Sequence, residues 1–205
     1  MTTLRFVLAS ASPARLAPLR DAGLDPAVGV SGVDESQVVE ADPAQLATAL
    51  AELKADTVAG RFADEGPQTG LLLGCDSVLE LDGQILGKPD DADDARARWR
   101  AMRGRRGVLH TGHCLLDLGA GTREVRAVDT VVHWADVDDD EIEAYVGTGE
   151  PLHVAGAFTL DGLGGAFVRG VEGDPHSVVG VSLPVLREMV RALGHRWTDL
   201  WSTRA

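Results

Sequence analysis

Short apolar runs and amphipathic stretches alternate along the first third of the chain. The run Leu4–Leu8 predicts a buried strand, and Ser12 followed by a proline predicts the cap and start of a helix that ends near Gly23. A second helix is predicted to begin at Asp42–Pro43. Lys54 lies at the edge of its apolar stripe. The stripe consists of Leu46, Leu50 and Leu53.

The middle of the chain carries the pattern of paired strands. Leu71–Cys75 predicts a buried strand. Val78–Leu81 and Gln84–Leu86 flank Asp82-Gly83, a dipeptide typical of two-residue hairpin turns. Asp76 is therefore expected where a strand ends and a hairpin begins.

The second half alternates helical and strand-like periods. The predicted elements are a helix from about Asp93 to Gly104, strands over Val108–Leu118 and Val125–Trp134, a short helix over Asp139–Val146, a glycine-rich strand region over Val154–Val171 and a last helix over Pro184–Leu193. Hairpin-paired strands separated by helices indicate an α/β fold with a mixed sheet and flanking helices. No linker is evident, so residues 1–205 are predicted to form one folding unit.

Composition narrows the classes of partner. The 205 residues include 19 Lys+Arg and 32 Asp+Glu, a net charge of -13, which is the wrong sign for a nucleic acid polymer or an anionic membrane. An anionic small substrate would need local basic side chains or a metal cation held by carboxylates. Cys75 and Cys114 form no CxxC motif, and the N-terminus has no signal-peptide layout, so a cytoplasmic protein is expected.

One group of residues suggests chemistry at the predicted element ends. A helix N-terminus flanked by serines favours an anion, because free N–H groups and the helix dipole point at it. The cations would neutralise a polyphosphate, and the carboxylates would hold Mg²⁺ or Mn²⁺ or serve as a base for water. The group comprises Ser10, Ser12, Arg15, Glu35, Lys54, Asp76 and Lys88. The alternative is structural: a capping Ser12, solvated lysines, and an Asp76 that caps the hairpin.

Nine segments spread over nearly the whole chain resemble the signature segments of the Maf proteins, in the same order. They are Leu8–Arg15, Val33–Glu35, Lys54–Ala55, Cys75–Ser77, Leu86–Pro89, His110–Gly112, Tyr145–Glu150, Ala155–Phe158 and Val178–Pro184. The resemblance implies a nucleoside triphosphate pyrophosphatase that uses a divalent metal to release a nucleoside monophosphate and pyrophosphate. It also implies an elongated inosine triphosphatase-like (Maf/Ham) fold, with two lobes around a deep cleft, and a homodimer.

The resemblance also assigns roles to individual residues. Asp76 matches the family's proton acceptor, and Glu35 matches the acidic partner near the metal, so both are expected metal ligands. The phosphate-facing cations are matched by Arg15, Lys54 and Lys88, and the phosphate turn by Ser10.

Three positions depart from the branch of the family that acts on thymidine and uridine triphosphates. They are Ala14 in place of arginine, Ser77 in place of threonine and Asp161 in place of glutamine. An acidic residue at Asp161 is similar to the 7-methylguanosine triphosphate branch, but the preferred base stays open. A second hypothesis is a nucleotide-binding regulator of cell division and septum formation with little turnover.

Overall fold

Three long strands form the centre of the structure, a computed structural model that describes residues 4–64 and 69–202. The domain predicted over 1–205 therefore includes residues outside the described part. The three long strands are β3 (Leu71–Leu81), β5 (Arg106–Asp117) and β6 (Thr122–Trp134), and β5 lies between the other two and runs antiparallel to both. The shorter strands are β1 (Phe6–Leu8), β2 (Ala27–Val28), β4 (Gln84–Leu86) and β7 (Val168–Glu172).

Together these strands make one seven-stranded sheet in the order β2-β1-β3-β5-β6-β7, with β4 paired to β3. β1 is parallel to both of its neighbours and the other pairs are antiparallel, so the predicted mixed α/β sheet is confirmed. The helices are α1 (Pro13–Asp21), α2 (Pro43–Asp64), α3 (Ala92–Met102), α4 (Asp139–Gly147), α5 (Pro175–Val179) and α6 (Leu183–Ala192). No helix within these described ranges is long and apolar enough to span a membrane.

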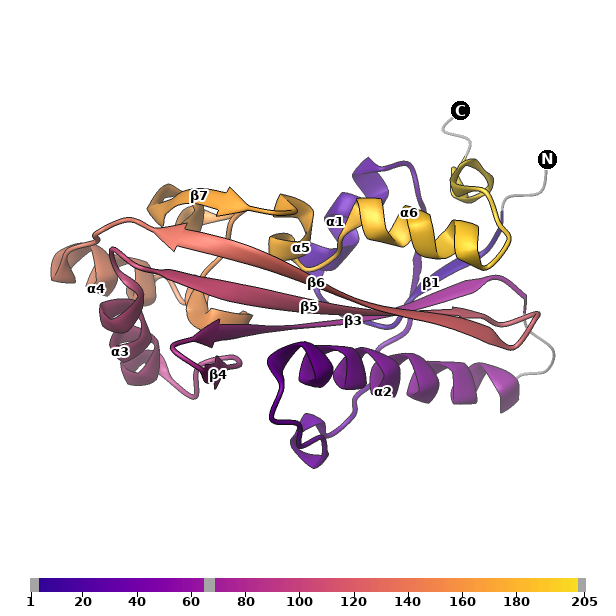
Figure 1. The fold of residues 1–205 in the computed structure, drawn as a ribbon, viewed down its shortest axis with the longest axis horizontal. Helices are drawn as coiled ribbons and strands as arrows, with labels where there is room; N and C mark the ends of the chain where they lie inside the picture. Colours follow the sequence, from indigo (N-terminus) through magenta and orange to yellow (C-terminus); the bar gives the residue numbers. More distant parts are fainter. Residues whose placement is uncertain (1–3, 65–68, 203–205) are drawn as a thin grey trace.

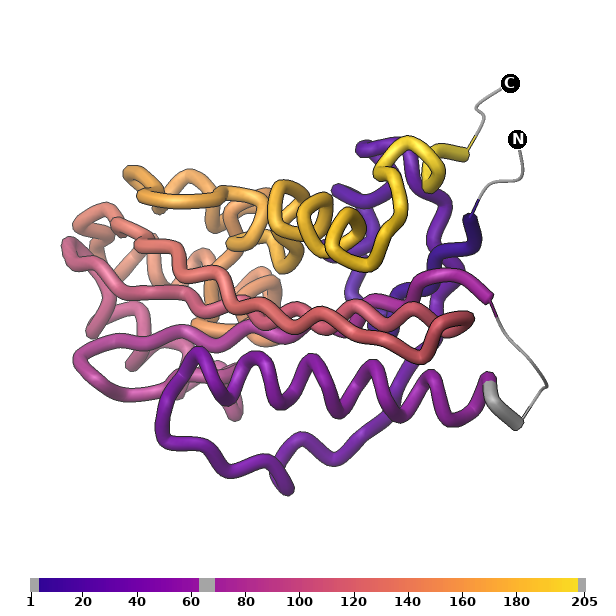
Figure 2. Tube along the Cα trace, turned by 45° about the vertical axis from the view of Figure 1, so that its right-hand side comes forward, coloured from indigo at the N-terminus to yellow at the C-terminus, as the bar shows by residue number. Residues whose placement is uncertain are grey.

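Helix α2 covers one face of the sheet, and α1 and α6 lie on the opposite face (Figure 1). Figure 2 shows α2 running alongside the long strands, with the C-terminal segment across the sheet from it. Two hydrophobic clusters fill these layers: one includes Leu19 of α1 and Met189 of α6, and the other includes Ala51 and Ala55 of α2. Cys75 belongs to the first cluster and Cys114 to the second, which places the two thiols on opposite faces of the sheet.

Glycines in the sheet allow α2 to approach the strands at backbone distance. A Cβ atom added at Gly74 would collide with the Ala51 carbonyl, and one added at Gly112 would collide with the Ala47 carbonyl. The helix face that docks there is made of small, fully buried alanines at positions 47, 51 and 55. Because α2 packs so closely, Lys54 on the same helix is buried against the sheet.

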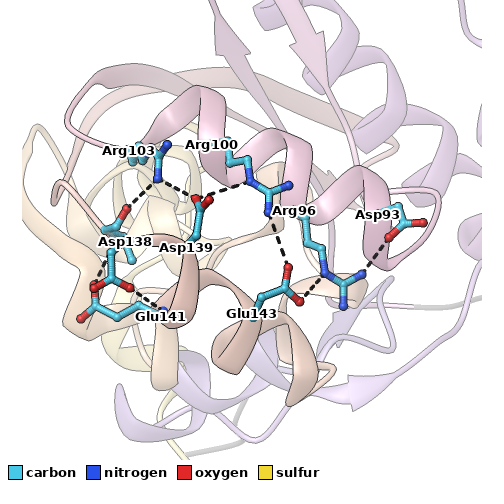
Figure 3. Close-up of polar contacts among 9 residues, drawn as sticks. Asp93, Arg96, Arg100, Arg103, Asp138, Asp139, Glu141 and Glu143 are labelled. Carbon is cyan, nitrogen blue, oxygen red and sulfur yellow. Dashed lines mark hydrogen bonds and ion pairs between the residues drawn. The ribbon is translucent and has the colours of Figure 1, made fainter.

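A third hydrophobic cluster occupies the other end of the sheet, where α3 and α4 pack beside it and bury Trp99 and Met102 completely. Ion pairs join the two helices on the outside: Arg96 pairs with Glu143, and Asp139 pairs with Arg100 and Arg103 (Figure 3). Exposed pairs of this kind are worth about 0.2–1 kcal/mol each. The buried side chains of the third cluster, rather than the ion pairs, therefore contribute most of the stability of this end.

Several predicted elements agree with the structure. Asp82 and Gly83 both have positive φ angles, 54° and 76°, as the predicted hairpin turn between β3 and β4 requires. The predicted helices over Asp139–Val146 and Pro184–Leu193 match α4 and α6 to within two residues.

Three local predictions are wrong. Asp76 lies in the middle of β3 rather than at its end, because β5 continues the ladder beyond it and pairs Asp76 with Gly112. Ser12 stands at the N-cap of α1, but its side chain makes no capping hydrogen bond. In the region predicted as a strand over Val154–Val171, only the last four residues belong to β7, since positive φ angles at Gly156 (69°) and Ala157 (59°) break the extended backbone.

Candidate functional site

One cavity of about 990 Å³ opens between the start of α1, the C-terminal half of β3 and the turns around residues 150–162. All eight site residues expected from the sequence line it: Ser10, Arg15, Glu35, Lys54, Asp76, Ser77, Lys88 and Asp161. They come from six different segments of the chain. The volume lies within the roughly 300–1,000 Å³ of small-ligand sites.

Lys54 lies at the centre of the charged residues. Its buried ammonium is 2.5 Å from Oδ1 of Asp76 and 2.8 Å from Oε1 of Glu35. A buried lysine of this kind is the opposite of the solvated lysine that the structural alternative assumes. Within the described residues, Oδ2 of Asp76 and Oε2 of Glu35 accept no hydrogen bond, so each carboxylate keeps one oxygen for another partner.

Arg15 closes the cluster from the side of α1. Its guanidinium is 3.6 Å from Oδ1 of Asp76, and it donates hydrogen bonds to Oγ of Ser10 at 3.4 Å and to the carbonyl of Gly180 at 3.2 Å. Gly180 has a φ of 122°, and an added Cβ atom would lie 3.0 Å from Cγ of Arg15. A glycine is needed there both for the backbone conformation and to leave room for the arginine.

Ser77 follows Asp76 on β3, and its hydroxyl has a defined direction. Thr111 donates its hydroxyl proton to the carbonyl of Ser177 at 2.9 Å, so the 3.1 Å contact between Ser77 and Thr111 uses the proton of Ser77. The oxygen of Ser77 is therefore left as an acceptor at the wall of the cavity.

Lys88 lies in an exposed turn after β4, as the structural alternative expects of it. Arg98 of α3 fixes this turn by donating to the carbonyls of Gly87 and Lys88 at 2.6 and 3.3 Å. The charge of Lys88 nevertheless acts on Glu35. Burial raises the pKa of Glu35, but the hydrogen bond and charge of Lys54, with the charges of Lys88 and Arg15, outweigh it and leave that pKa below its usual value.

Comparisons with known proteins give the family of this chain. The family model described as Maf-like protein matches residues 5–193. This chain belongs to the Maf family. A relative from Salinispora tropica is 58% identical over 97% of this chain and 88% of its own length. Relatives from Streptomyces coelicolor and Trichormus variabilis are 56% and 48% identical over 97% and 98% of the chain, and 95% and 100% of their own lengths. All three bear the name nucleoside triphosphate pyrophosphatase.

In this Maf chain the expected metal ligands amount to two carboxylates. The described residues contain no group of three or more His, Cys, Asp or Glu side chains that could hold a metal ion. Glu35 and Asp76 converge on one point, where the Lys54 ammonium lies. Mg²⁺ is commonly bound by one or two protein carboxylates together with substrate phosphates and water. The donor set therefore fits a cation that arrives with its substrate.

One residue of the Maf cavity received no role from the sequence. Glu150 lines the cavity and accepts hydrogen bonds from two hydroxyl groups and two backbone amides. Its position at the end of the segment Tyr145–Glu150 is the only signal in the sequence, because its partners lie 5 to 14 residues away, in α4 and in the stretch from Thr159 to Gly164.

Proposed function

We propose that this chain, like its named relatives, is a nucleoside triphosphate pyrophosphatase, a hydrolase that cleaves between the α- and β-phosphates. The observation that carries this proposal is the meeting of Asp76, Lys54, Arg15 and Glu35 in one cavity large enough for a nucleotide. Its products are a nucleoside monophosphate and pyrophosphate.

Asp76 is the proposed general base. Oδ1 is held by Lys54 and faces Arg15, which fixes the orientation of the carboxylate. Oδ2 is then the oxygen that can accept a proton from the attacking water. Such a positioned base contributes about 10²- to 10⁴-fold to a rate.

The phosphates are proposed to lie toward the start of α1. Ser10, the N-terminus of α1 and Arg15 form that wall, and free N–H groups with the helix dipole favour an anion there. Lys54 and Lys88 would face the same phosphates from α2 and from the turn after β4.

The charges of the cavity explain why a metal is part of the proposal. Seven charged residues line it, three cations and four carboxylates: Arg15, Lys54, Lys88, Glu35, Asp76, Glu150 and Asp161. Side chains alone therefore do not neutralise a triphosphate. A bound Mg²⁺ or Mn²⁺ would supply the missing charge and polarise the phosphate oxygens. Glu35 and Asp76 would hold it.

The nucleobase is proposed to lie toward Ser77 and Asp161, which line the same cavity. Both present acceptors there, a hydroxyl oxygen and an exposed carboxylate. A base with N–H groups on its edge fits these acceptors. The proposal also includes the two-lobed Maf/Ham arrangement around the cavity and a homodimer, which sedimentation of the purified chain would test.

The test is product analysis in ¹⁸O-labelled water, over a panel of canonical and 7-methylated nucleoside triphosphates with Mg²⁺ or Mn²⁺. Attack of water on the α-phosphorus is expected to release unlabelled pyrophosphate and a labelled monophosphate. Orthophosphate as the first product would overturn the proposal. Tight nucleotide binding without any cleavage would instead favour the nucleotide-binding regulator.

A further inference from the structure

The carboxylate of Glu150 joins two parts of the cavity wall. Oε1 accepts hydrogen bonds from the hydroxyl of Tyr145 at 3.0 Å, from Oγ1 of Thr159 at 2.5 Å and from the amide of Gly164 at 3.0 Å. Oε2 accepts from the amide of Leu163 at 3.0 Å. The segment Thr159–Gly164, called the 159–164 loop below, is thus tied to Glu150 at both ends.

The shape of the loop is built around this carboxylate. A Cβ atom added at Gly162 would lie 2.7 to 2.8 Å from the carboxylate atoms of Glu150. One added at Gly164 would collide with the Tyr145 hydroxyl and lie 2.9 Å from the backbone of Thr159. Both glycines therefore let the loop backbone approach its anchor closely.

Tyr145, which donates to Glu150, is itself held in place by packing. Tyr145 is almost fully buried, and its ring packs edge-on against Trp99 and Phe167, with centroids 5.3 and 5.5 Å away. Trp99 in turn donates its indole N–H to the carbonyl of Ala157 at 2.8 Å, just before the loop. The loop is connected through Glu150 to the hydrophobic cluster that also holds α3 and α4.

Glu150 has little capacity left for a ligand. An ionised carboxylate has about two acceptor sites on each oxygen; three hydrogen bonds from the protein fill Oε1, and one more leaves a single site on Oε2. Burial raises the pKa of Glu150, but the hydrogen bonds from Thr159, Leu163, Gly164 and Tyr145 outweigh it and lower that pKa. The carboxylate is thus kept ionised as an acceptor for the loop.

We infer that Glu150 is a positioning residue for nucleobase selection, because it fixes the 159–164 loop and with it Asp161 at the cavity wall. This inference rests on the proposed function, in which Asp161 faces the base. Glu150 acts through the loop and touches neither the phosphates nor the attacking water. Its loss should therefore change which nucleotide is preferred more than it changes the chemical step.

The main test is Glu150→Gln, which replaces one acceptor oxygen by an NH₂ group facing N–H or O–H donors. A donor that loses its acceptor there no longer holds the loop in its place. We expect the ratio of kcat/KM between the preferred and a poor nucleotide to fall about tenfold, through KM, while kcat for the preferred nucleotide stays within about threefold. Glu143→Gln, the same change at an exposed glutamate of α4, should leave the ratio unchanged.

Two milder variants cover the case in which Glu150→Gln does not fold. Thr159→Val removes the 2.5 Å donor and Tyr145→Phe removes the 3.0 Å donor, and each should lower the ratio in the same direction by a smaller factor. An equal loss of kcat for every nucleotide, with the ratio unchanged, would overturn the inference.

Hydrogen exchange separates this inference from the proposed function. The Leu163 and Gly164 amides should exchange faster in Glu150→Gln than in the parent, whether or not the protein cleaves a nucleotide. If the parent cleaves nothing, the proposed function fails, and with it the selection role. If these two amides exchange at the parent rate in the variant, the loop is not held by Glu150 and the inference fails by itself.

Discussion

The close approach of α2 to the sheet is tested by Gly112→Ala. Gly112 pairs with Asp76 across β3 and β5, and an added Cβ atom would lie 2.5 Å from the amide nitrogen of Thr48 and closer still to the Ala47 carbonyl. Real Cβ atoms keep at least 3.0 Å from such neighbours. Because the obstacles are backbone atoms, and the Ala47 carbonyl oxygen is the nearest, α2 must move outward by at least about 0.8 Å.

Two opposing free-energy changes set the size of the effect. Alanine in a strand is favoured over glycine by about 0.5–1 kcal/mol, and overpacking a well-filled contact costs about 1–3 kcal/mol. We expect a net loss of about 0.5–2 kcal/mol in the free energy of unfolding, measured by urea denaturation. The outward shift also carries Lys54 away from Asp76. Since a misplacement near 1 Å can cost about 10²-fold, pyrophosphate release should fall by about 10- to 100-fold.

Gly60→Ala is the matched control on the same helix. An added Cβ atom there meets nothing within 4 Å, so the variant should gain about 0.5–1 kcal/mol of stability and keep the parent rate. If Gly112→Ala proves as stable and as active as Gly60→Ala, the backbone contact between α2 and β5 does not set the position of Lys54.

Three further predictions concern single side chains and their surroundings. Trp99→Phe removes the indole donor from a buried carbonyl and should cost about 1–3 kcal/mol in urea denaturation, whereas Trp201→Phe, at a half-exposed position, should change stability by no more than about 0.5 kcal/mol. Burial raises the pKa of Cys75 and of Cys114 to about 12, so neither thiol should react with Ellman's reagent at pH 8 until the protein unfolds; rapid labelling of the native protein would contradict this. Glu35 has a folded-state pKa below its usual 4.5, so its contribution to stability is present above about pH 4.5 and is lost as the pH falls through the folded value. In Glu35→Gln, the free energy of unfolding should therefore fall less steeply as the pH is lowered below about 4.5. If it falls as steeply as in the parent, the ion pair between Glu35 and Lys54 contributes nothing to stability.

Local sequence signals predicted those elements whose cause is local. The turn at Asp82-Gly83 needs two positive φ angles, and an Asp-Gly dipeptide favours that conformation. The helix predicted from about Asp93 to Gly104 matches α3 to within two residues, because its period is local. The eight site residues were placed by the order of the Maf-like segments, and they line one cavity although their positions in the chain are far apart.

What the sequence did not predict depends on partners distant in the chain. β3 continues through Asp76 because β5 pairs with it there, and no signal near Asp76 carries that information. Of the three leucines that predicted the buried face of α2, Leu50 is buried and Leu46 and Leu53 are partly exposed. The alanines of α2 dock on the sheet instead and bury Lys54, because Gly74 and Gly112 admit a helix at backbone distance. The 159–164 loop lacks a period of its own, since Glu150 rather than regular structure holds it.

The rate of pyrophosphate release by Asp76→Asn tests the central claim most directly. The change keeps the size of the side chain but removes the proton acceptor, so the rate should fall by about 10²- to 10⁴-fold with the fold intact by circular dichroism. The parent rate should also fall on the acid side as a carboxylate is protonated, and Asp25→Asn, at an exposed position, should match the parent throughout. An Asp76→Asn variant that works within tenfold of the parent would contradict the assignment of Asp76 as the base.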